Sequence, residues 1–396
     1  MRVRPLEGGI DAWRAAGYPV EAPAAPPPVA ADAGAVSDGP GSDGAATGGR
    51  SAAILSVLVL SLFVAGAAAP SATSKSTSDK LLRYLQFTPD EQAAIRRGTI
   101  TSHVVKEFSD KELALTMAVL APAPLDKLLD AIRSDRLLEA DRQILAHGPL
   151  SFGSDGSLDP EALAQVGFTA SEGSELRELF EAGPGSKLNL SASETRTFAE
   201  VRRASSATAC DKEPACAQSV VSALRTLLHD RAVAYRARGL GGIEPYARAG
   251  GPPSDPAADL RQANEAARFL GDEYPAIYEA WRDYPKGDPA VLESRFLWLK
   301  QMVQDRPAFI LSHRVWCQRE GIAFAAERQF YVTRSYNALQ IFVGLIPEGD
   351  KTLLVYFNRT SSDQVAGFPS VTRHSVGRRI LEKAVRTQLE EMLAQP

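Results

Sequence analysis

The sequence predicts an α+β fold in which an antiparallel sheet packs on a long C-terminal helix. Four apolar or alternating segments, rich in Val, Ile, Phe, Tyr and Leu, are typical of strands: residues 308–317, 322–334, 337–346 and 352–358. The run Pro347-Glu-Gly-Asp350 predicts a hairpin turn between the last two. Residues 375–393 then carry an apolar stripe at helical spacing, which suits a helix lying across a sheet.

The part of the fold that precedes these strands is predicted in two pieces. In residues 79–155, apolar runs at 100–105 and 113–120 predict two strands. The order Thr88, Pro89, Glu91 predicts a capped helix start before them, and Leu125, Leu128, Leu129 and Ile132 predict a helix after them. Residues 156–303 are interpreted as a large α-helical insertion, and residues 304–396 hold the later strands and the final helix.

Aromatic residues gather near the end of the predicted insertion. They are Tyr274, Tyr278, Trp281, Tyr284, Phe296 and Trp298. The first three are spaced three or four residues apart, as on one face of a helix, so we interpret the group as helix-packing core. An aromatic box around a ligand is the alternative.

Composition and charge exclude several classes of function. Of 396 residues, 44% are hydrophobic and 23% are charged, as in an ordinary globular protein. The net charge of −4 gives no overall basic field, so we expect no nucleic-acid partner. Five scattered histidines, three cysteines and the lack of a phosphate-binding loop or nucleophile elbow provide no recognisable site, so we expect no metal, no cofactor and no catalytic set.

The chain begins with a short motif whose residues each have a local role. Gly8-Gly9 allows a tight turn, Trp13 offers an apolar face, and Gly17 ends a short helix before Pro19. Residues 1–22 thereby resemble the C-terminal end of a rhodanese domain. A rhodanese carries its sulfur-accepting cysteine upstream of this segment, whereas the first cysteine here is Cys210. We interpret the segment as a remnant without sulfurtransferase activity; a chance match is the alternative.

A linker and a hydrophobic segment follow. Residues 23–50 are rich in Ala, Pro, Gly, Ser and Asp, which predicts a disordered linker. Residues 52–69 are uncharged, follow Arg50 and end in small residues. We expect one N-terminal hydrophobic helix over 51–69, either a transmembrane helix contacting the membrane or a signal peptide. A buried core helix is disfavoured, because nothing beside the segment could cover it.

Both membrane interpretations place the rest of the chain outside the cytoplasm. We therefore expect a bacterial protein that is periplasmic or extracytoplasmic, and membrane-anchored or secreted. Cys210 and Cys216 are close enough in sequence to form a local disulfide in an oxidising compartment, with two isolated thiols as the alternative. Cys317 lies in an apolar strand segment and is interpreted as a buried thiol.

Two resemblances cover most of the exported part. The order of strands, a helix opened by Ala-Pro in residues 119–132, further antiparallel strands and a final helix resembles the helix-grip fold of the StAR-related lipid-transfer superfamily. Residues 80–393 also resemble a family of uncharacterised exported bacterial proteins, through these segments: residues 328–334, residues 356–360, Asp363, Gly367 and residues 377–379. The second resemblance implies no activity, and the predicted helical insertion departs from a plain helix-grip domain.

One polar group stands at the ends of adjacent predicted strands. It consists of Arg334, Asn358, Arg359, Thr360 and Asp363. These side chains are candidates for binding an anionic head group at the mouth of a cavity, since a guanidinium matches carboxylate or phosphate geometry. The alternative is a structural Arg–Asp network in which the Asn and Thr satisfy turn backbone.

The sequence therefore predicts a non-enzymatic protein that binds a hydrophobic or amphipathic small molecule, such as a lipid-like ligand. A sheet that grips a long helix leaves an apolar cavity, and such cavities are common ligand sites. Two alternatives remain open: a hydrolase or cyclase acting in the same cavity, for which no acid–base pair is visible, and a structural envelope protein whose helical segment docks a partner.

Overall fold

The structure, a computed structural model, describes residues 72–134, 138–139, 141–183, 187–205, 210–366 and 370–394. The predictions for residues 1–22, 23–50 and 51–69 lie outside these residues. Within the described ranges, no helix combines the length and the apolar character needed to cross a membrane.

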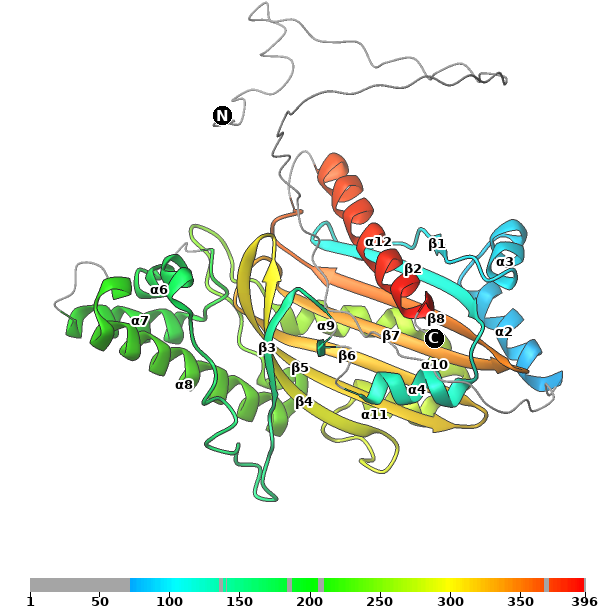
Figure 1. Cartoon of the computed structure of the whole chain (residues 1–396), viewed down its shortest axis with the longest axis horizontal. Helices are drawn as coiled ribbons and strands as arrows, with labels where there is room; N and C mark the ends of the chain where they lie inside the picture. The colour runs from blue at the N-terminus through cyan, green and yellow to red at the C-terminus, as the bar shows by residue number, and fades with distance from the viewer. Residues whose placement is uncertain are drawn as a thin grey trace, which may run out of the picture. The chain divides into compact units, whose positions relative to one another are not determined.

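An eight-stranded antiparallel sheet forms the centre of the fold, as the sequence predicts (Figure 1). Its strands run in the spatial order β1-β2-β8-β7-β6-β5-β4-β3. Their bounds are β1 Thr101–His103, β2 Glu112–Ala121, β3 Ile144–Pro149, β4 Glu293–Val303, β5 Arg306–Arg319, β6 Ile322–Val332, β7 Ala338–Glu348 and β8 Lys351–Ser361. Strands β7 and β8 form the predicted hairpin, closed where Glu348 pairs with Lys351.

One face of the sheet is covered by α4 (Leu125–Arg133) and α12 (Ser370–Ala394), which face the viewer in Figure 1. Leu128 and Leu129 of α4 and Val385 of α12 share one buried core with alternate residues of the central strands. The shared core arises because every second side chain of a strand points to the same face. We call this side the α12 face.

The opposite face is covered by most of the other helices, and we call it the α8 face. The helices on the α8 face are α2 Ala72–Tyr84, α3 Pro89–Arg96, α6 Gly173–Phe180, α7 Ala192–Ala204, α8 Pro214–Arg238, α9 Pro256–Asn264, α10 Arg268–Glu273 and α11 Pro275–Arg282. Leu228 of α8 shares a core with Phe309 of β5, whereas the next residue, Ile310, belongs to the core under α12. Both faces of the central strands are thus buried.

Local sequence signals explain where several helices begin. Thr88 caps α3, because its side chain accepts from the Glu91 amide and Glu91 bonds back to the Thr88 amide. This is the predicted capping box. Ser191 and Glu194 form the same arrangement at the start of α7.

The prediction of a helical insertion through residue 303 is wrong at its C-terminal end, because Glu293–Val303 forms strand β4. Phe296 and Trp298, expected in a helical core, therefore lie on a strand. A strand buried on both faces reads as a continuous apolar run, and periodicity cannot separate such a run from a buried helix. The sequence also fails to indicate the turn between β4 and β5, because Gln304 and Asp305 adopt positive φ values of 52° and 62° and neither is a glycine.

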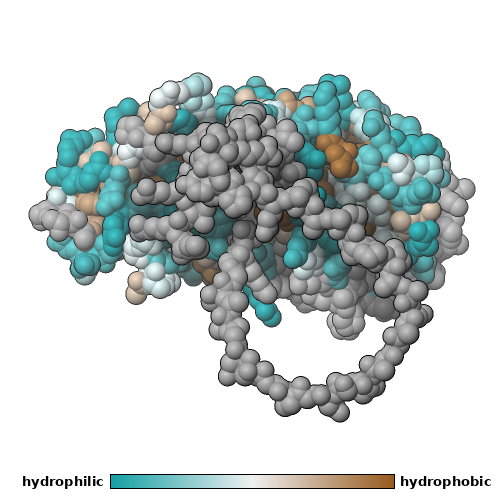
Figure 2. Space-filling model, turned by 90° about the horizontal axis from the view of Figure 1, so that it is seen from above, coloured by the Kyte–Doolittle hydropathy of each residue, from teal (hydrophilic) through white to brown (hydrophobic). Residues whose placement is uncertain are grey.

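The described surface is mainly hydrophilic in the view of Figure 2. The exposed large hydrophobic side chains of the described ranges are Tyr84, Val104, Phe108 and Leu145. They come from three separate parts of the chain: α2, the segment after β1, and β3.

Candidate functional site

Two of the predicted site residues, Arg334 and Asp363, line one polar cavity of about 460 Å³. Arg334 forms ion pairs with Glu175 and Glu178 of α6, both at 2.6 Å. Asp363 is paired with Arg248, whose Nε lies 2.8 Å from Oδ2. Burial opposes ionisation of Asp363, but hydrogen bonds from Ser254, Lys111 and Arg248 prevail and hold its pKa well below the usual range.

The other three predicted residues lie on β8 and point to different faces. Arg359 extends to the α8 face, where its Nη1 lies 2.9 Å from the Glu112 carboxylate. Asn358 donates from Nδ2 to the Tyr356 hydroxyl at 3.2 Å, and Thr360 donates to Asn358 Oδ1 at 2.8 Å. The structure therefore brings Arg334 and Asp363 to one cavity and places Arg359 elsewhere.

A second cavity, of about 410 Å³, lies on the α8 face and has a different lining. Its apolar walls come from the loop after β3, from α11 and the loop that follows it, and from β4 and β5. These side chains are Leu150, Phe152, Trp281, Tyr284, Leu292, Phe296 and Val315. Its polar lining includes Arg236 of α8, Ser294 of β4 and His313 of β5. We call it the His313 cavity.

Strand register places His313 in a row of residues that crosses the α8 face of the sheet. His313 is the direct partner of Phe296 on β4 and of Arg328 on β6. Arg328 is in turn the partner of Gln340 on β7, and Gln340 is the partner of Arg359 on β8. Directly opposite residues share a face, so an aromatic ring, an imidazole and two guanidinium groups lie in one line.

A chain of hydrogen bonds runs along this row from the buried sheet to the cavity. Arg328 Nη1 donates to the Tyr235 hydroxyl at 3.0 Å, and that hydroxyl lies 3.0 Å from His313 Nδ1. On the other side of the ring, Nε2 lies 2.5 Å from Ser294 Oγ. Ser294 is exposed, whereas His313, Tyr235 and Arg328 are fully buried.

The direction of donation follows from counting hydrogens. The Tyr235 oxygen accepts from Arg328, so its own single hydrogen is the one available to His313 Nδ1. His313 then carries its proton on Nε2 and donates it to Ser294 Oγ. This tautomer is assigned from the network. The Ser294 O–H is then not used by His313 and stays available to donate to another acceptor.

The imidazole of His313 is neutral at pH 7. Burial lowers its pKa well below the ordinary value, and the positive charges of Arg328 and Arg236 lower it further. Phe296 stacks on the ring at a centroid distance of 4.3 Å and an interplanar angle of 8°. Burial also raises the pKa of Tyr284, a neighbouring wall residue, to about 12, so its hydroxyl stays protonated.

Arg328 is a fully buried cation without a carboxylate partner in the described part of the chain. Its Nε bonds Gln340 Oε1 at 3.0 Å and its Nη2 bonds Asn264 Oδ1 at 3.3 Å. The guanidinium also lies 4.0 Å from the centre of the Trp281 ring. Neutral groups thus satisfy its donors, but none of them cancels its charge.

The sequence does not predict the hydrogen-bonded group of Ser294, His313, Tyr235 and Arg328, because its members come from separate elements and form no recognised motif. One signal was present in the sequence. His313 and Arg328 interrupt two strongly apolar strand segments, and a charged or titratable residue inside a buried strand requires a partner.

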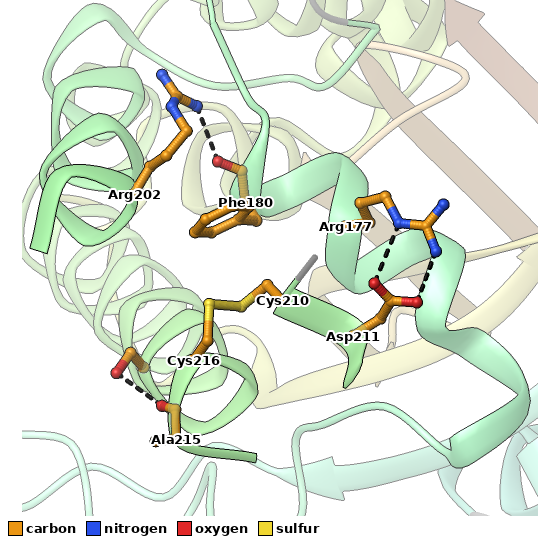
Figure 3. Close-up of a disulfide and its surroundings, with 8 residues drawn as sticks. Arg177, Phe180, Arg202, Cys210, Asp211, Ala215 and Cys216 are labelled. Carbon is orange, nitrogen blue, oxygen red and sulfur yellow. Dashed lines mark hydrogen bonds and ion pairs between the residues drawn. A yellow bond between two sulfur atoms is a disulfide. The ribbon is translucent and has the colours of Figure 1, made fainter. Parts of the chain in front are cut away.

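The three cysteines lie in two separate parts of the structure, and Figure 3 shows the disulfide-bonded pair. Cys210 and Cys216 are joined by a disulfide with a Cα–Cα distance of 5.1 Å, at the start of α8. Beside it, Asp211 is ion-paired with Arg177 at 2.6 Å. Cys317 is a buried free thiol on β5, and burial raises its pKa to about 11.

Among the described residues, no three His, Cys, Asp or Glu side chains gather closely enough to hold a metal ion. Comparison of the chain with protein-family models, with curated proteins and with solved structures gives no match.

Proposed function

We propose that this protein binds a hydrophobic or amphipathic small molecule in the His313 cavity. The observation that carries the proposal is the cavity itself, with a volume of about 410 Å³ and a lining that combines aromatic and aliphatic side chains with polar and charged ones. Ligand sites typically occupy roughly 300–1,000 Å³ and combine apolar walls with a few fixed polar groups. Ser294, His313 and Arg236 are polar groups of this kind.

The hydrogen-bond chain favours binding over acyl transfer. A serine nucleophile needs a base that accepts its proton, but the assigned tautomer of His313 donates to Ser294 instead. The opposite tautomer would direct two hydrogens at the Tyr235 oxygen, one from His313 and one from Arg328, and leave the phenolic hydrogen without its partner. The alternative of a hydrolase in this cavity therefore lacks its base.

The finer fold assignment also stays a proposal. A sheet covered by α4 and α12 supports a helix-grip-like domain, but the ligand cavity that we propose lies on the other face. Between α12 and the sheet, a cavity of about 90 Å³ is lined by Leu113, Thr360 and Leu381, among others. This volume is well below that of a typical ligand site.

We further propose that the chain is exported, anchored or secreted through residues 51–69, and that residues 1–22 are a rhodanese remnant. The disulfide between Cys210 and Cys216 gives weak support to an oxidising compartment. A phosphatase reporter fused after residue 80 tests export: activity is expected, and a cytoplasmic signal would contradict the proposal.

Filling the cavity tests the binding function. Full-length protein is purified in one defined detergent, and bound small molecules other than that detergent are extracted and identified by mass spectrometry. Ser294→Trp places a bulky ring in the cavity and should abolish the bound species. Glu293→Trp is the matched control, because Glu293 pairs with Arg133 of α4 on the other face of the same strand. Equal ligand content in both variants, or none in the unaltered protein, would refute the function.

A further inference from the structure

The His313 cavity lies beside buried positive charge that has no carboxylate partner in the described part of the chain. Five arginines are buried in the described part of the chain. Four of them have a carboxylate oxygen within 3.0 Å: Arg231, Arg314, Arg334 and Arg359. Arg328 is the exception, and it is also the one linked through Tyr235 and His313 to the cavity.

A second uncompensated cation lies directly in the wall. Arg236, in the last turn of α8, lines the cavity and donates from Nη1 to the Tyr284 hydroxyl at 3.0 Å. Its guanidinium carbon is 5.9 Å from the ring centres of both Phe152 and Phe296. In the described residues it has no carboxylate partner within 4.0 Å. Aromatic rings attract this charge but do not neutralise it.

One other pair of charges in the lining has to be counted. Asp288 and Arg295 both contribute to the wall, and they carry opposite signs. The Asp288 carboxylate accepts from the Ala290 amide at 2.9 Å, which fixes it in its own loop. The charges of Asp288 and Arg295 cancel in the sum, so Arg236 leaves the lining with a net positive charge. Arg328, which is buried behind the lining, adds a second positive charge.

We infer that the occupant of the His313 cavity is an organic anion: a single negatively charged oxygen group, such as a carboxylate, on an apolar body. This inference rests on the proposed binding function and adds the chemical class. The anionic group would face Arg236 and accept a hydrogen bond from the Ser294 hydroxyl, whose hydrogen is not used by His313. Trp281, Tyr284 and Phe296 would pack against the body.

The field that lowers the pKa of His313 agrees in sign with this inference. Both cations disfavour a further positive charge at the imidazole, and for the same reason they favour a negative charge nearby. An apolar, partly enclosed site strengthens such an attraction relative to water.

The test compares matched pairs of small molecules that differ only in charge. Naphthalene-2-carboxylate is compared with naphthalene-2-carboxamide, and decanoate with decanamide, by titration calorimetry on the full chain. We expect each binding acid to bind at least about tenfold more tightly than its amide, which corresponds to about 1.4 kcal/mol. The aromatic and aliphatic pairs distinguish the two kinds of apolar body.

A variant locates the effect. Arg236→Gln should remove most of the preference for the acid and leave the affinity for the amide within about twofold, since only the charge term is lost. Arg238→Gln, at an exposed position in the same turn of α8, is the control and should behave as the unaltered protein.

The outcomes separate the two proposals. If an amide binds as tightly as its acid, and Ser294→Trp blocks both, the anion inference is overturned while the binding function stands. If no acid and no amide binds, and no native ligand is found, both fall. If the acid preference survives Arg236→Gln, the anion is bound elsewhere and the inference is wrong.

Discussion

Ser294 Oγ lies 2.5 Å from His313 Nε2, and this contact joins an exposed serine to a fully buried histidine. The two residues come from neighbouring strands, β4 and β5. Tyr235 and Arg328 lie on the buried side of His313. Groups that a ligand cannot reach therefore decide which ring nitrogen of His313 donates to Ser294. A ligand in this cavity would meet a hydroxyl that is free to donate its hydrogen.

The buried imidazole predicts a pH dependence of stability. The folded-state pKa of His313 is lowered, so between that value and an unfolded value of about 6.5 the unfolded chain binds the extra proton. Stability therefore rises with pH through this window and is lost as the pH falls. The contribution of one such group is at most about 1.4 kcal/mol per pH unit.

His313→Gln should flatten this dependence, as measured by urea unfolding at several pH values between 5 and 7. His229→Gln, at a half-buried position on α8, is the matched control for removing a histidine. A slope that is the same in His313→Gln and in the unaltered protein would mean that the histidine titrates normally in the fold.

Removing the Tyr235 hydroxyl should be costly, because it joins two buried partners. Tyr235→Phe leaves an Arg328 N–H and His313 Nδ1 without their hydrogen bonds, and each unsatisfied buried group costs about 1–3 kcal/mol. Tyr331→Phe is the matched control, since Tyr331 is also fully buried but its hydroxyl has no hydrogen-bond partner in the described structure. Equal losses of unfolding free energy in the two variants would contradict the hydrogen-bond chain.

The sheet could be predicted in part, and the reason for the limit is visible in β4. Strands β5 to β8 carry many β-branched and aromatic residues and end in recognisable turns, so their existence was predictable. Strand β4 is buried on both sides and follows a long helical stretch, and the turn that joins it to β5 has no glycine. Pairing with β3 and β5 distinguishes it from a helix.

The candidate site was harder to predict, because its partners are distant in the sequence. The sequence predicts Arg334 as a ligand-binding residue, but its counterion Glu178 is 156 residues away on α6. Conversely, Arg328 has no counterion in the described structure, although nothing in the sequence around it reveals this. Which buried arginine is paired depends on tertiary contacts.

Replacing Arg314 by methionine should lower the unfolding free energy more than the same replacement of Arg328. Arg314→Met leaves Glu327 as a fully buried carboxylate without its cation and should cost about 3–5 kcal/mol. Arg328→Met removes an uncompensated charge and loses hydrogen bonds to neutral groups together with the contact to the Trp281 ring, so we expect a smaller loss, of about 2 kcal/mol. Urea unfolding measures both, and a loss in Arg328→Met as large as that in Arg314→Met would indicate a hidden counterion.

The disulfide should stabilise the fold only modestly. It closes a short loop with a sequence separation of 6, and the chain-entropy gain grows with the logarithm of loop length. Replacing both Cys210 and Cys216 by serine should therefore lower the unfolding free energy by no more than about 3 kcal/mol.

The same disulfide makes a chemical prediction for protein isolated from its native compartment. A non-reducing peptide map should show Cys210 linked to Cys216 and Cys317 as a free thiol. Cys317 is buried on β5, and its raised pKa keeps the sulfur protonated and poorly nucleophilic at pH 7. Because the bond lies at the first turn of α8 and Arg236 lies at the last, reduction should leave affinity for the cavity ligand unchanged while lowering stability. A parallel loss of binding on reduction would show that the two ends of α8 are coupled.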